Sequence, residues 1–204
     1  MTEMRHRLEV IRLVSLVGPG GIGKTRLALE VARSLGSRYA DGVILVDLAP
    51  LAIPELVVQA VARALELRIE LDREPQAAIL RFLTARQLLL ILDNCEHLVD
   101  ACADLVAALL QTCPGVSVLA TSREPLGVDG EIISRLGPLD EDAGMDLFVD
   151  RARAQCADID PGDRMVVRQL CLALDNLPLA IELAAARVTL LGPAEMLARL
   201  ADRE

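Results

Sequence analysis

The sequence predicts a three-layer α/β/α fold around a five-stranded, mainly parallel sheet, followed by a small all-helical domain. Three features of the chain predict it. Short apolar runs alternate with segments of helical periodicity as far as residue 138. A glycine-rich loop joins the first apolar run to the first helical segment. Beyond Pro138 no convincing strand occurs, and four helical segments follow one another.

Five segments are predicted as strands because they are short, apolar and rich in β-branched residues. They cover 12–17, 43–48, 88–92, 116–120 and, more weakly, 131–136. The continuously apolar run at 88–92 is typical of a parallel strand covered on both faces. Strands that alternate with helices imply right-handed crossovers and a mainly parallel sheet.

Helices are predicted where apolar residues recur at helical spacing. In the α/β part these segments run from Thr25 to Leu35 and over 54–67, 75–84 and 98–112, and residues 1–11 look like the remnant of another helix. After the change of pattern they cover 141–157, 163–174, 178–190 and 193–201. We therefore expect an α/β domain over 1–139 and a helical domain over 140–204.

The glycine-rich loop has the pattern of a phosphate-binding loop. It reads Gly18-Pro19-Gly20-Gly21-Ile22-Gly23-Lys24-Thr25 and is followed by Arg26, which we include in the expected nucleotide-binding set. Glycines let the backbone wrap closely around a phosphate chain, and the N–H groups of the loop form an anion nest. Lys24 is expected to reach the β- and γ-phosphates, and the Thr25 hydroxyl to ligate Mg²⁺.

The alternative for this loop is a glycine-rich turn that happens to precede a lysine. Composition argues against it, since Lys24 is the only lysine among 21 lysine and arginine residues. A compact ammonium fits among phosphate oxygens, and a planar guanidinium is not an equivalent replacement.

A second candidate site follows the third predicted strand. Asp93 ends an apolar run and would hold Mg²⁺ at the carboxyl edge of the sheet. The next residue is Asn94, an amide that cannot take a proton from water. Glu96 is the nearest carboxylate that could replace a catalytic base there, and it can equally be a helix N-terminal residue placed for the dipole. We therefore expect slow chemistry.

The fourth predicted strand is followed by Thr121-Ser122-Arg123-Glu124. Arg123 could sense a γ-phosphate through charge-assisted hydrogen bonds, or it could belong to a surface Arg–Glu loop. The residues alone do not decide between these two roles of Arg123.

Composition excludes several classes of protein. The net charge of −9 and pI near 4.8 argue against binding of nucleic acid through a basic surface by this segment. The chain has no run of about 18 apolar residues, and Met1 to Glu9 is charged rather than apolar, unlike a signal peptide. We therefore expect no membrane contact and a cytoplasmic location. The five cysteines are expected to be free thiols, and the two histidines are isolated, which gives no support to a zinc site.

With these features in order, the chain resembles the signal-transduction ATPases of the NB-ARC family, also called AP-ATPases and placed in the STAND class. It is most similar to the ATPase module of bacterial transcriptional regulators with a LuxR-type or SARP-type DNA-binding domain. The matching segments are GPGGIGKTRLALE at 18–30, DGVILVDLA at 41–49, LLLILDNCEHL at 88–98, VLATSREPLG at 118–127 and LPLAIELAAAR at 177–187.

The resemblance implies a P-loop NTPase sheet with strand order 2-3-4-1-5. It also implies that Arg123 is the sensor arginine and that Pro178 lies against the adenine. The residues alone suggest only that Pro178 is the first residue of a helix. The chain departs from the family at Asn176, where a glycine is usual, and Asn tolerates the left-handed region. Family members also carry a G-R-E segment upstream that Met1 to Glu9 lacks.

The expected function is an ATP/ADP-binding switch with Mg²⁺ in a cytoplasmic signal-transduction or transcriptional regulator, with slow or absent hydrolysis. The winged-helix, sensor and DNA-binding domains of the family are expected elsewhere in a full-length regulator, together with nucleotide-dependent self-association. The alternatives are a P-loop kinase or ligase, and a truncated, non-catalytic interaction remnant.

Overall fold

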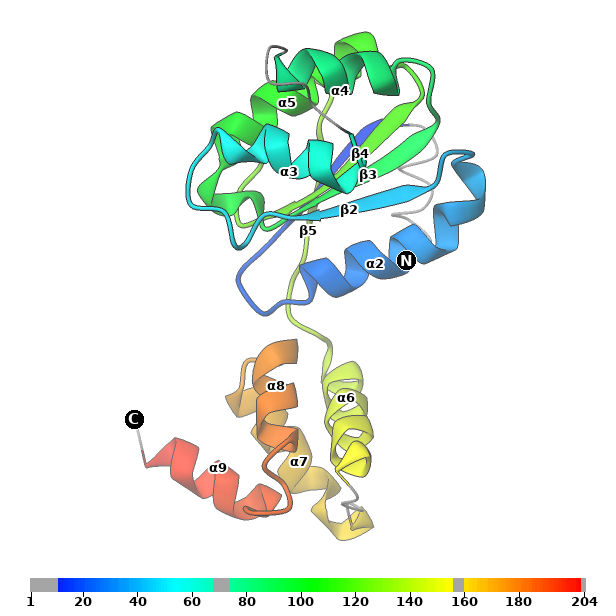
Figure 1. The fold of residues 1–204 in the computed structure, drawn as a ribbon. Helices are drawn as coiled ribbons and strands as arrows, with labels where there is room; N and C mark the ends of the chain where they lie inside the picture. The colour runs from blue at the N-terminus through cyan, green and yellow to red at the C-terminus, as the bar shows by residue number, and fades with distance from the viewer. Residues whose placement is uncertain (1–10, 68–73, 156–159, 203–204) are drawn as a thin grey trace. The chain divides into compact units, whose positions relative to one another are not determined.

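The computed structural model describes residues 11–67, 74–155 and 160–202, and the chain divides into two compact units (Figure 1). The first unit takes 1–19 with 24–136, and the second takes 20–23 with 137–204. The helix expected over residues 1–11 lies, except for Ile11, outside the described residues.

A five-stranded sheet forms the centre of the first unit and confirms the expected fold class. Its order is β2-β3-β4-β1-β5, and every neighbouring pair is parallel. The carboxyl ends of all the strands therefore meet at one edge, where open α/β sheets bind ligands. The strands are β1 (Leu13–Val17), β2 (Val43–Asp47), β3 (Leu88–Asp93), β4 (Val116–Ser122) and β5 (Ile132–Arg135).

Helices cover both faces of this sheet, as Figure 1 shows. Successive side chains of a strand point to opposite faces, so β3 contributes to two cores. Leu89 and Ile91 pack with α2 on one face, and Leu90 and Leu92 pack with three helices on the other. These helices are α2 (Lys24–Leu35) on the first face, and α3 (Leu56–Ala64), α4 (Pro75–Leu83) and α5 (Val99–Thr112) on the second.

The boundaries of α3 differ from the expected range of 54–67. The helix begins at Leu56 because the N–H groups of its first two residues close i→i+3 turns rather than helical bonds. It ends at Ala64, and Glu66 takes a φ of +55°, which a right-handed helix cannot continue. The other strands and helices of this unit start and end close to the expected residues.

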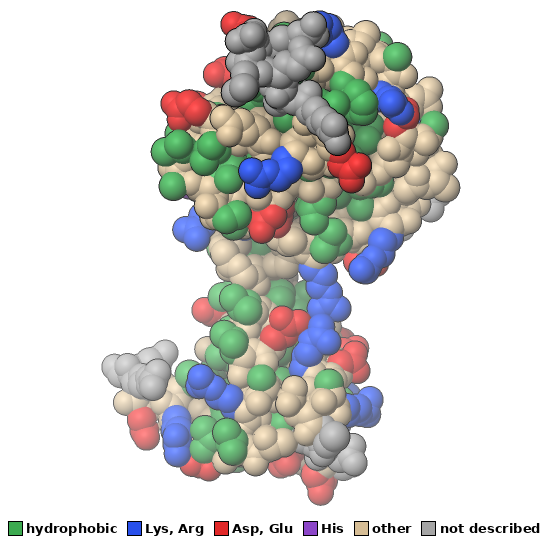
Figure 2. Space-filling model, viewed as in Figure 1, with side chains coloured by type: hydrophobic (Ala, Val, Ile, Leu, Met, Phe, Trp, Pro, Cys, Tyr) green, Lys and Arg blue, Asp and Glu red, His purple; other side chains and the backbone are tan. Residues whose placement is uncertain are grey.

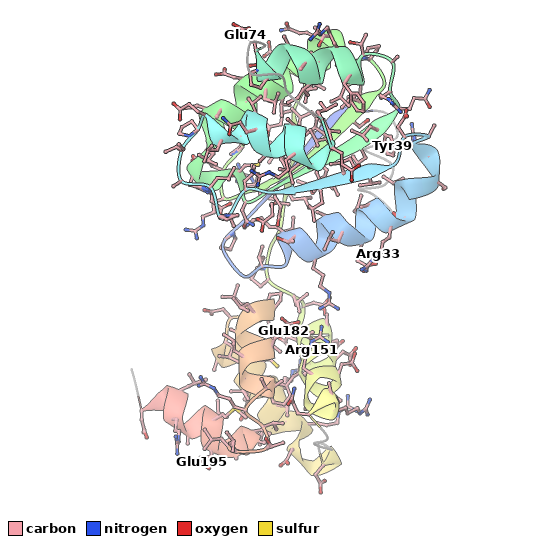
Figure 3. All side chains as sticks on the ribbon, viewed as in Figure 1. Arg33, Tyr39, Glu74, Arg151, Glu182 and Glu195 are labelled. Atoms are coloured by element: carbon pink, nitrogen blue, oxygen red, sulfur yellow. The ribbon has the colours of Figure 1, made fainter. Side chains whose placement is uncertain are left out.

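The second unit is helical and has its own core. Phe148, Val167, Leu170 and Ile181 are fully buried in it. The Arg151 side chain of α6 pairs with Glu182 of α8, with 3.0 Å between Nε and Oε1 (Figure 3). The helices are α6 (Glu141–Ala154), α7 (Arg164–Ala173), α8 (Pro178–Ala185) and α9 (Pro193–Ala201).

Helix α8 is shorter than the expected 178–190. After Ala185 the backbone closes i→i+3 turns, in which Val188 donates to Ala185 O and Leu190 donates to Arg187 O. These tighter turns end the helix. The turn before α8 contains Asn176 at a φ of +50°, so this asparagine does adopt the left-handed conformation.

The described cysteines Cys95, Cys102, Cys113 and Cys171 are free and buried, as expected. Burial raises the pKa of the Cys171 thiol to about 11. Acidic and basic side chains are interspersed on the face of each unit seen in Figure 2. Among the described residues, no helix is both long and apolar enough to span a bilayer, and no cluster of His, Cys, Asp and Glu is arranged to hold a metal by itself.

Candidate nucleotide-binding site

The glycine-rich loop lies between β1 and α2, as the sequence predicts. Gly21 and Gly23 take φ values of +74° and +93°. The space beside Gly23 is open, so only its backbone conformation requires glycine there. The N–H of Gly18 donates to Ser122 O at 3.2 Å, which ties the start of the loop to the end of β4.

Lys24 is the first residue of α2, and only 7% of it is exposed. Its ammonium donates to Gly18 O at 2.8 Å and to Pro19 O at 3.0 Å. In the described part of the chain no carboxylate pairs with it. A buried ammonium held by neutral carbonyls alone attracts an anion, because burial of an unpaired charge costs free energy.

Asp93 ends β3 and is 4% exposed. The Thr25 hydroxyl donates to its two carboxylate oxygens, at 2.8 Å from Oδ1 and 2.9 Å from Oδ2. The Thr121 hydroxyl, at the end of β4, also donates to Oδ1. No arginine or lysine of the described residues pairs with this carboxylate. Hydroxyl and carboxylate oxygens are the ligands that Mg²⁺ prefers, so the set fits this metal.

Asn94 follows β3 in the left-handed region, with φ 65° and ψ 50°. Its backbone N–H donates to Thr121 Oγ1 at 3.0 Å. Its side-chain Nδ2 donates to Asp93 Oδ2 at 3.2 Å and to Asp47 Oδ1 at 3.3 Å. Asp47 is the last residue of β2 and the register partner of Asp93. Asp47 is not among the site residues predicted from the sequence, although β2, like β3, is an apolar run that ends in Asp.

Glu96 and Arg123 form an ion pair at the same edge, with 3.3 Å between Oε1 and Nε. Glu96 belongs to the 3-10 helix η2 (Cys95–His97), and neither η2 nor α5 has a side-chain hydrogen bond at its N-cap. The Glu96 side chain is 22% exposed, but its Oε2 is buried without a hydrogen-bond partner in the described structure. The Arg123 side chain is 67% exposed.

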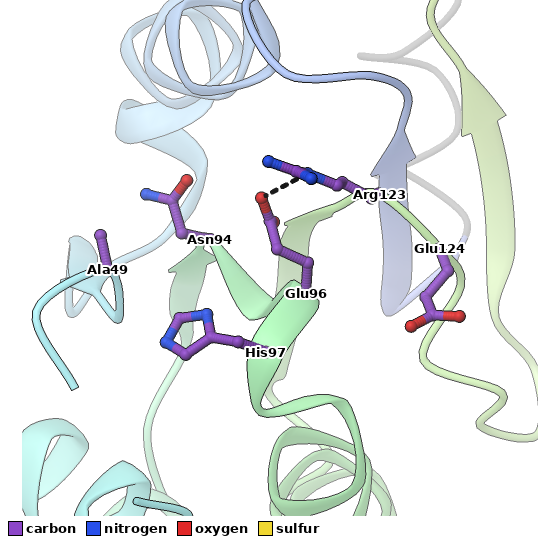
Figure 4. A pocket seen from close by; sticks show the side chains of 6 residues that line it. All are labelled: Ala49, Asn94, Glu96, His97, Arg123 and Glu124. Atoms are coloured by element: carbon purple, nitrogen blue, oxygen red, sulfur yellow. Dashed lines mark ion pairs between the residues drawn. The ribbon is translucent and has the colours of Figure 1, made fainter. Parts of the chain in front are cut away.

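These two residues line a cavity of about 460 Å³ at the carboxyl edge of the sheet (Figure 4). His97 lines it too, and its Nε2 lies 2.9 Å from Leu51 O. The lining residues are Ala49, Asn94, Glu96, His97, Arg123 and Glu124.

The remaining expected site residues differ in their surroundings. Pro19 and Gly20 are exposed, whereas Ile22 is 4% exposed and packs inward. Arg26 is exposed in the first turn of α2. Pro178 lies in the second unit, as the first residue of α8, and is half-buried.

Residues 10–125 match the protein family described as AAA domain, and the chain belongs to this family. The match covers the loop, both metal-ligand candidates and the Glu96–Arg123 pair. Members of the class are P-loop NTPases, so a nucleotide is the ligand that this fold implies.

Bacterial regulators are among the relatives. The chain is 44% identical to a candidate HTH-type transcriptional regulator of Mycobacterium tuberculosis, and the match covers 98% of this chain and 23% of the regulator. It is 31% identical to the regulatory protein AfsR of Streptomyces griseus, covering 92% of this chain and 20% of AfsR. The chain thus spans about a quarter or less of the length of these relatives.

Solved structures share the fold at low sequence identity. The Cdc6p structure from Pyrobaculum aerophilum matches with a TM-score of 0.65 and 13% identity, over 94% of this chain and 60% of that one. A STAND protein (signal transduction ATPase with numerous domains) with a tetratricopeptide repeat sensor, from Pyrococcus horikoshii, matches with a TM-score of 0.55 and 15% identity. That match covers 87% of this chain and 28% of the other.

Proposed function

We propose that this chain is the ATP/ADP-binding switch module of a cytoplasmic transcriptional regulator of the STAND class, close to its NB-ARC members. One observation carries the proposal. Lys24 and Asp93 are both more than nine-tenths buried, carry opposite charges and have only neutral hydrogen-bond partners in the described structure. A nucleotide phosphate chain with Mg²⁺ supplies the anion for the first and the cation for the second.

In this proposal each residue has a separate role. The loop backbone from Gly18 to Gly23 and the Lys24 ammonium hold the phosphates. Thr25 and Asp93 hold Mg²⁺, which neutralises phosphate charge when bound. Arg26 and Pro178 remain nucleotide contacts on the strength of the resemblance alone.

The ion pair of Glu96 and Arg123 supports discrimination between ATP and ADP. Only ATP carries a γ-phosphate, and this group would compete with Glu96 for the exposed Arg123 guanidinium. A nucleotide shifts a two-state equilibrium only by its difference in affinity for the two states. We therefore infer that ADP favours the resting state and ATP the active, self-associating state, and that slow hydrolysis resets the switch.

The names of the relatives support the regulatory part of the proposal, since they describe transcriptional regulators. The winged-helix, sensor and DNA-binding domains would then lie in other parts of a full-length protein. This segment would bind the nucleotide and would not contact DNA itself.

Calorimetric titration with ADP, and with ATP in the presence of Mg²⁺, tests the proposal. Lys24→Ala should weaken the binding of both nucleotides by about 10- to 100-fold, since hydrogen bonds to charged groups contribute about 1.5–3 kcal/mol. Arg33→Ala is the matched control, because Arg33 is an exposed cation on the same helix and pairs with Glu30. Equal nucleotide affinities of Lys24→Ala and the parent chain would contradict the assignment of the phosphate-binding loop.

The same assay addresses the enzyme alternative. A steady ATPase rate that appears only with a second small substrate would favour a P-loop kinase or ligase. Nucleotide binding without such dependence favours the switch.

A further inference from the structure

Asn94 connects the ends of two neighbouring strands. Asp47 and Asp93 are register partners at the carboxyl ends of β2 and β3, and the Asn94 Nδ2 donates to both carboxylates. Carboxylates of ionised Asp only accept hydrogen bonds, whereas an amide has a donating and an accepting side. The two aspartates therefore decide which way the amide of Asn94 is turned.

The backbone of Asn94 is fixed independently of its side chain. Its N–H is bound by Thr121 Oγ1, and its left-handed conformation is one that Asn tolerates better than most residues. Asp47 is held as well, because its Oδ1 accepts the N–H of Ala49 at 2.9 Å. Only rotation of the amide is left, and Asp47 restrains it together with Asp93.

The accepting side of this amide is the one that remains available. Within residues 11–67, 74–155 and 160–202, Asn94 Oδ1 accepts no hydrogen bond and is not buried. Asn94 lines the cavity that also contains Glu96 and Arg123 (Figure 4). An amide oxygen there can accept a hydrogen bond from water, although it cannot take the proton.

We propose that Asp47 is a positioning residue for ATP hydrolysis, which acts by turning the Asn94 amide so that its Oδ1 orients the attacking water. The inference rests on the proposed function. In the step concerned, the water oxygen bonds to the γ-phosphorus and the bond from that phosphorus to the β,γ-bridging oxygen breaks. The electron pair leaves with ADP, and the proton of water passes to the Glu96 carboxylate.

If Asp47 had a purely structural role, its substitutions would change the stability of the fold and not the orientation of the Asn94 amide. Its bond to Ala49 N–H spans two residues and is an Asx turn, which would matter for folding alone. Asp47→Ser keeps an oxygen for such a turn but removes the carboxylate that reaches Asn94. Asp47→Asn keeps the size but lets the residue donate, so the amide of Asn94 loses one of its two restraints and is held by Asp93 alone.

Single-turnover ATP hydrolysis in a double-mutant cycle tests the inference. We expect Asp47→Asn and Asp47→Ser each to lower the rate about 10-fold, because a reacting group misplaced by about 1 Å can cost about 100-fold and Asp93 still holds the amide in part. In the Asn94→Gly background, which keeps the left-handed backbone but lacks the amide, the same changes should alter the rate by less than about twofold. Asp104→Asn, an exposed carboxylate on α5, should leave the rate unchanged.

A second readout does not depend on activity. In nucleotide-free protein, the ¹⁵N and ¹H resonances of the Asn94 side-chain amide should shift on Asp47→Asn and stay in place on Asp104→Asn. An unmoved Asn94 resonance, or an equal loss of rate in the parent and Asn94→Gly backgrounds, would overturn the positioning role.

The affinity for ADP separates this inference from the proposed function. Parent protein that binds ADP but shows no hydrolysis overturns the role of Asp47 and leaves the nucleotide-binding proposal intact. Parent protein that does not bind ADP contradicts the proposed function, and the inference with it. Unchanged ADP affinity of both Asp47 variants together with the expected rates supports the positioning role.

Discussion

Aspartates stand at both ends of β2, and the two ends compensate their charges differently. At the amino end, Asp41 accepts hydrogen bonds from the Arg86 side chain and from the N–H of Gln87. At the carboxyl end, Asp47 and Asp93 are held by hydroxyl, amide and backbone donors, and no cation of the described residues pairs with them. Asp41 lies two residues before β2, and Arg86 and Gln87 directly precede β3, so both groups flank the same pair of strands.

The difference separates a structural carboxylate from a functional one. The pKa of Asp41 is lowered mainly by the hydrogen bond from Arg86, so its charge is already satisfied within the chain. Asp93 is buried with its charge uncompensated, which costs stability unless a cation binds. Changes at the carboxyl edge should therefore affect chemistry and binding, and changes at the amino edge should affect stability.

The largest expected effect concerns Glu96, whose buried Oε2 has no hydrogen-bond partner in the described structure. The parent chain should turn over ATP below about 1 s⁻¹, because the residue after Asp93 is an amide rather than a base. Glu96→Gln should lower the single-turnover rate by about 100-fold or more, since an amide cannot accept the proton. ADP affinity, measured by calorimetry, should not change.

Two results would contradict this role of Glu96. Turnover of ATP by the parent chain at tens per second would favour the alternative that the chain is a P-loop enzyme. An unchanged rate for Glu96→Gln would leave the carboxylate with the helix-dipole role that the sequence also allowed.

The next effect concerns the metal. Asp93→Ala should weaken the binding of ATP with Mg²⁺ by about 10-fold or more, because a charged ligand of the cation is lost. Binding of ADP in the presence of a chelator should change far less. Titrations of both nucleotides in both conditions measure this, and an equal loss in all of them would mean that Asp93 supports the fold rather than the cation.

The smallest effect lies at the amino edge. A lowered folded-state pKa means that the Asp41 carboxylate stabilises the protein above its unfolded pKa and loses this contribution as the pH falls through the folded pKa. Asp41→Asn should therefore lower Tm by about 1–2 °C at pH 7, with no difference from the parent in strong acid. Thermal melts from pH 7 downwards, with Asp104→Asn as control, measure the difference. A deficit that persists unchanged at low pH would assign the effect to packing.

The fold and the loop could be predicted because their signals are local. Apolar runs locate β1 to β4, and the glycine spacing locates the phosphate-binding loop between a strand and a helix. The boundaries that were wrong depend on single backbone conformations, as with Glu66 after α3 and the i→i+3 turns after α8.

The network around Asn94 could not be predicted from the sequence in the same way. It depends on the register of β2 and β3, which places Asp47 beside Asp93 although 45 residues lie between them in the chain. It also depends on Thr121 at the end of β4, whose hydroxyl reaches both Asp93 and the N–H of Asn94. The strand order that the resemblance implies already places β2 beside β3, and the acids that end these two strands were the signal that could have identified Asp47.

Lys24 can be labelled or modified selectively, because it is the single lysine of the 204-residue chain. Isotope labelling of lysine alone would place one ammonium signal in the spectrum, and that signal would report directly on the loop. Amine-directed reagents would find one lysine side chain, which is 7% exposed and lies against the loop carbonyls. The extent of its modification with and without nucleotide would therefore measure occupancy of the site without any substitution in the protein.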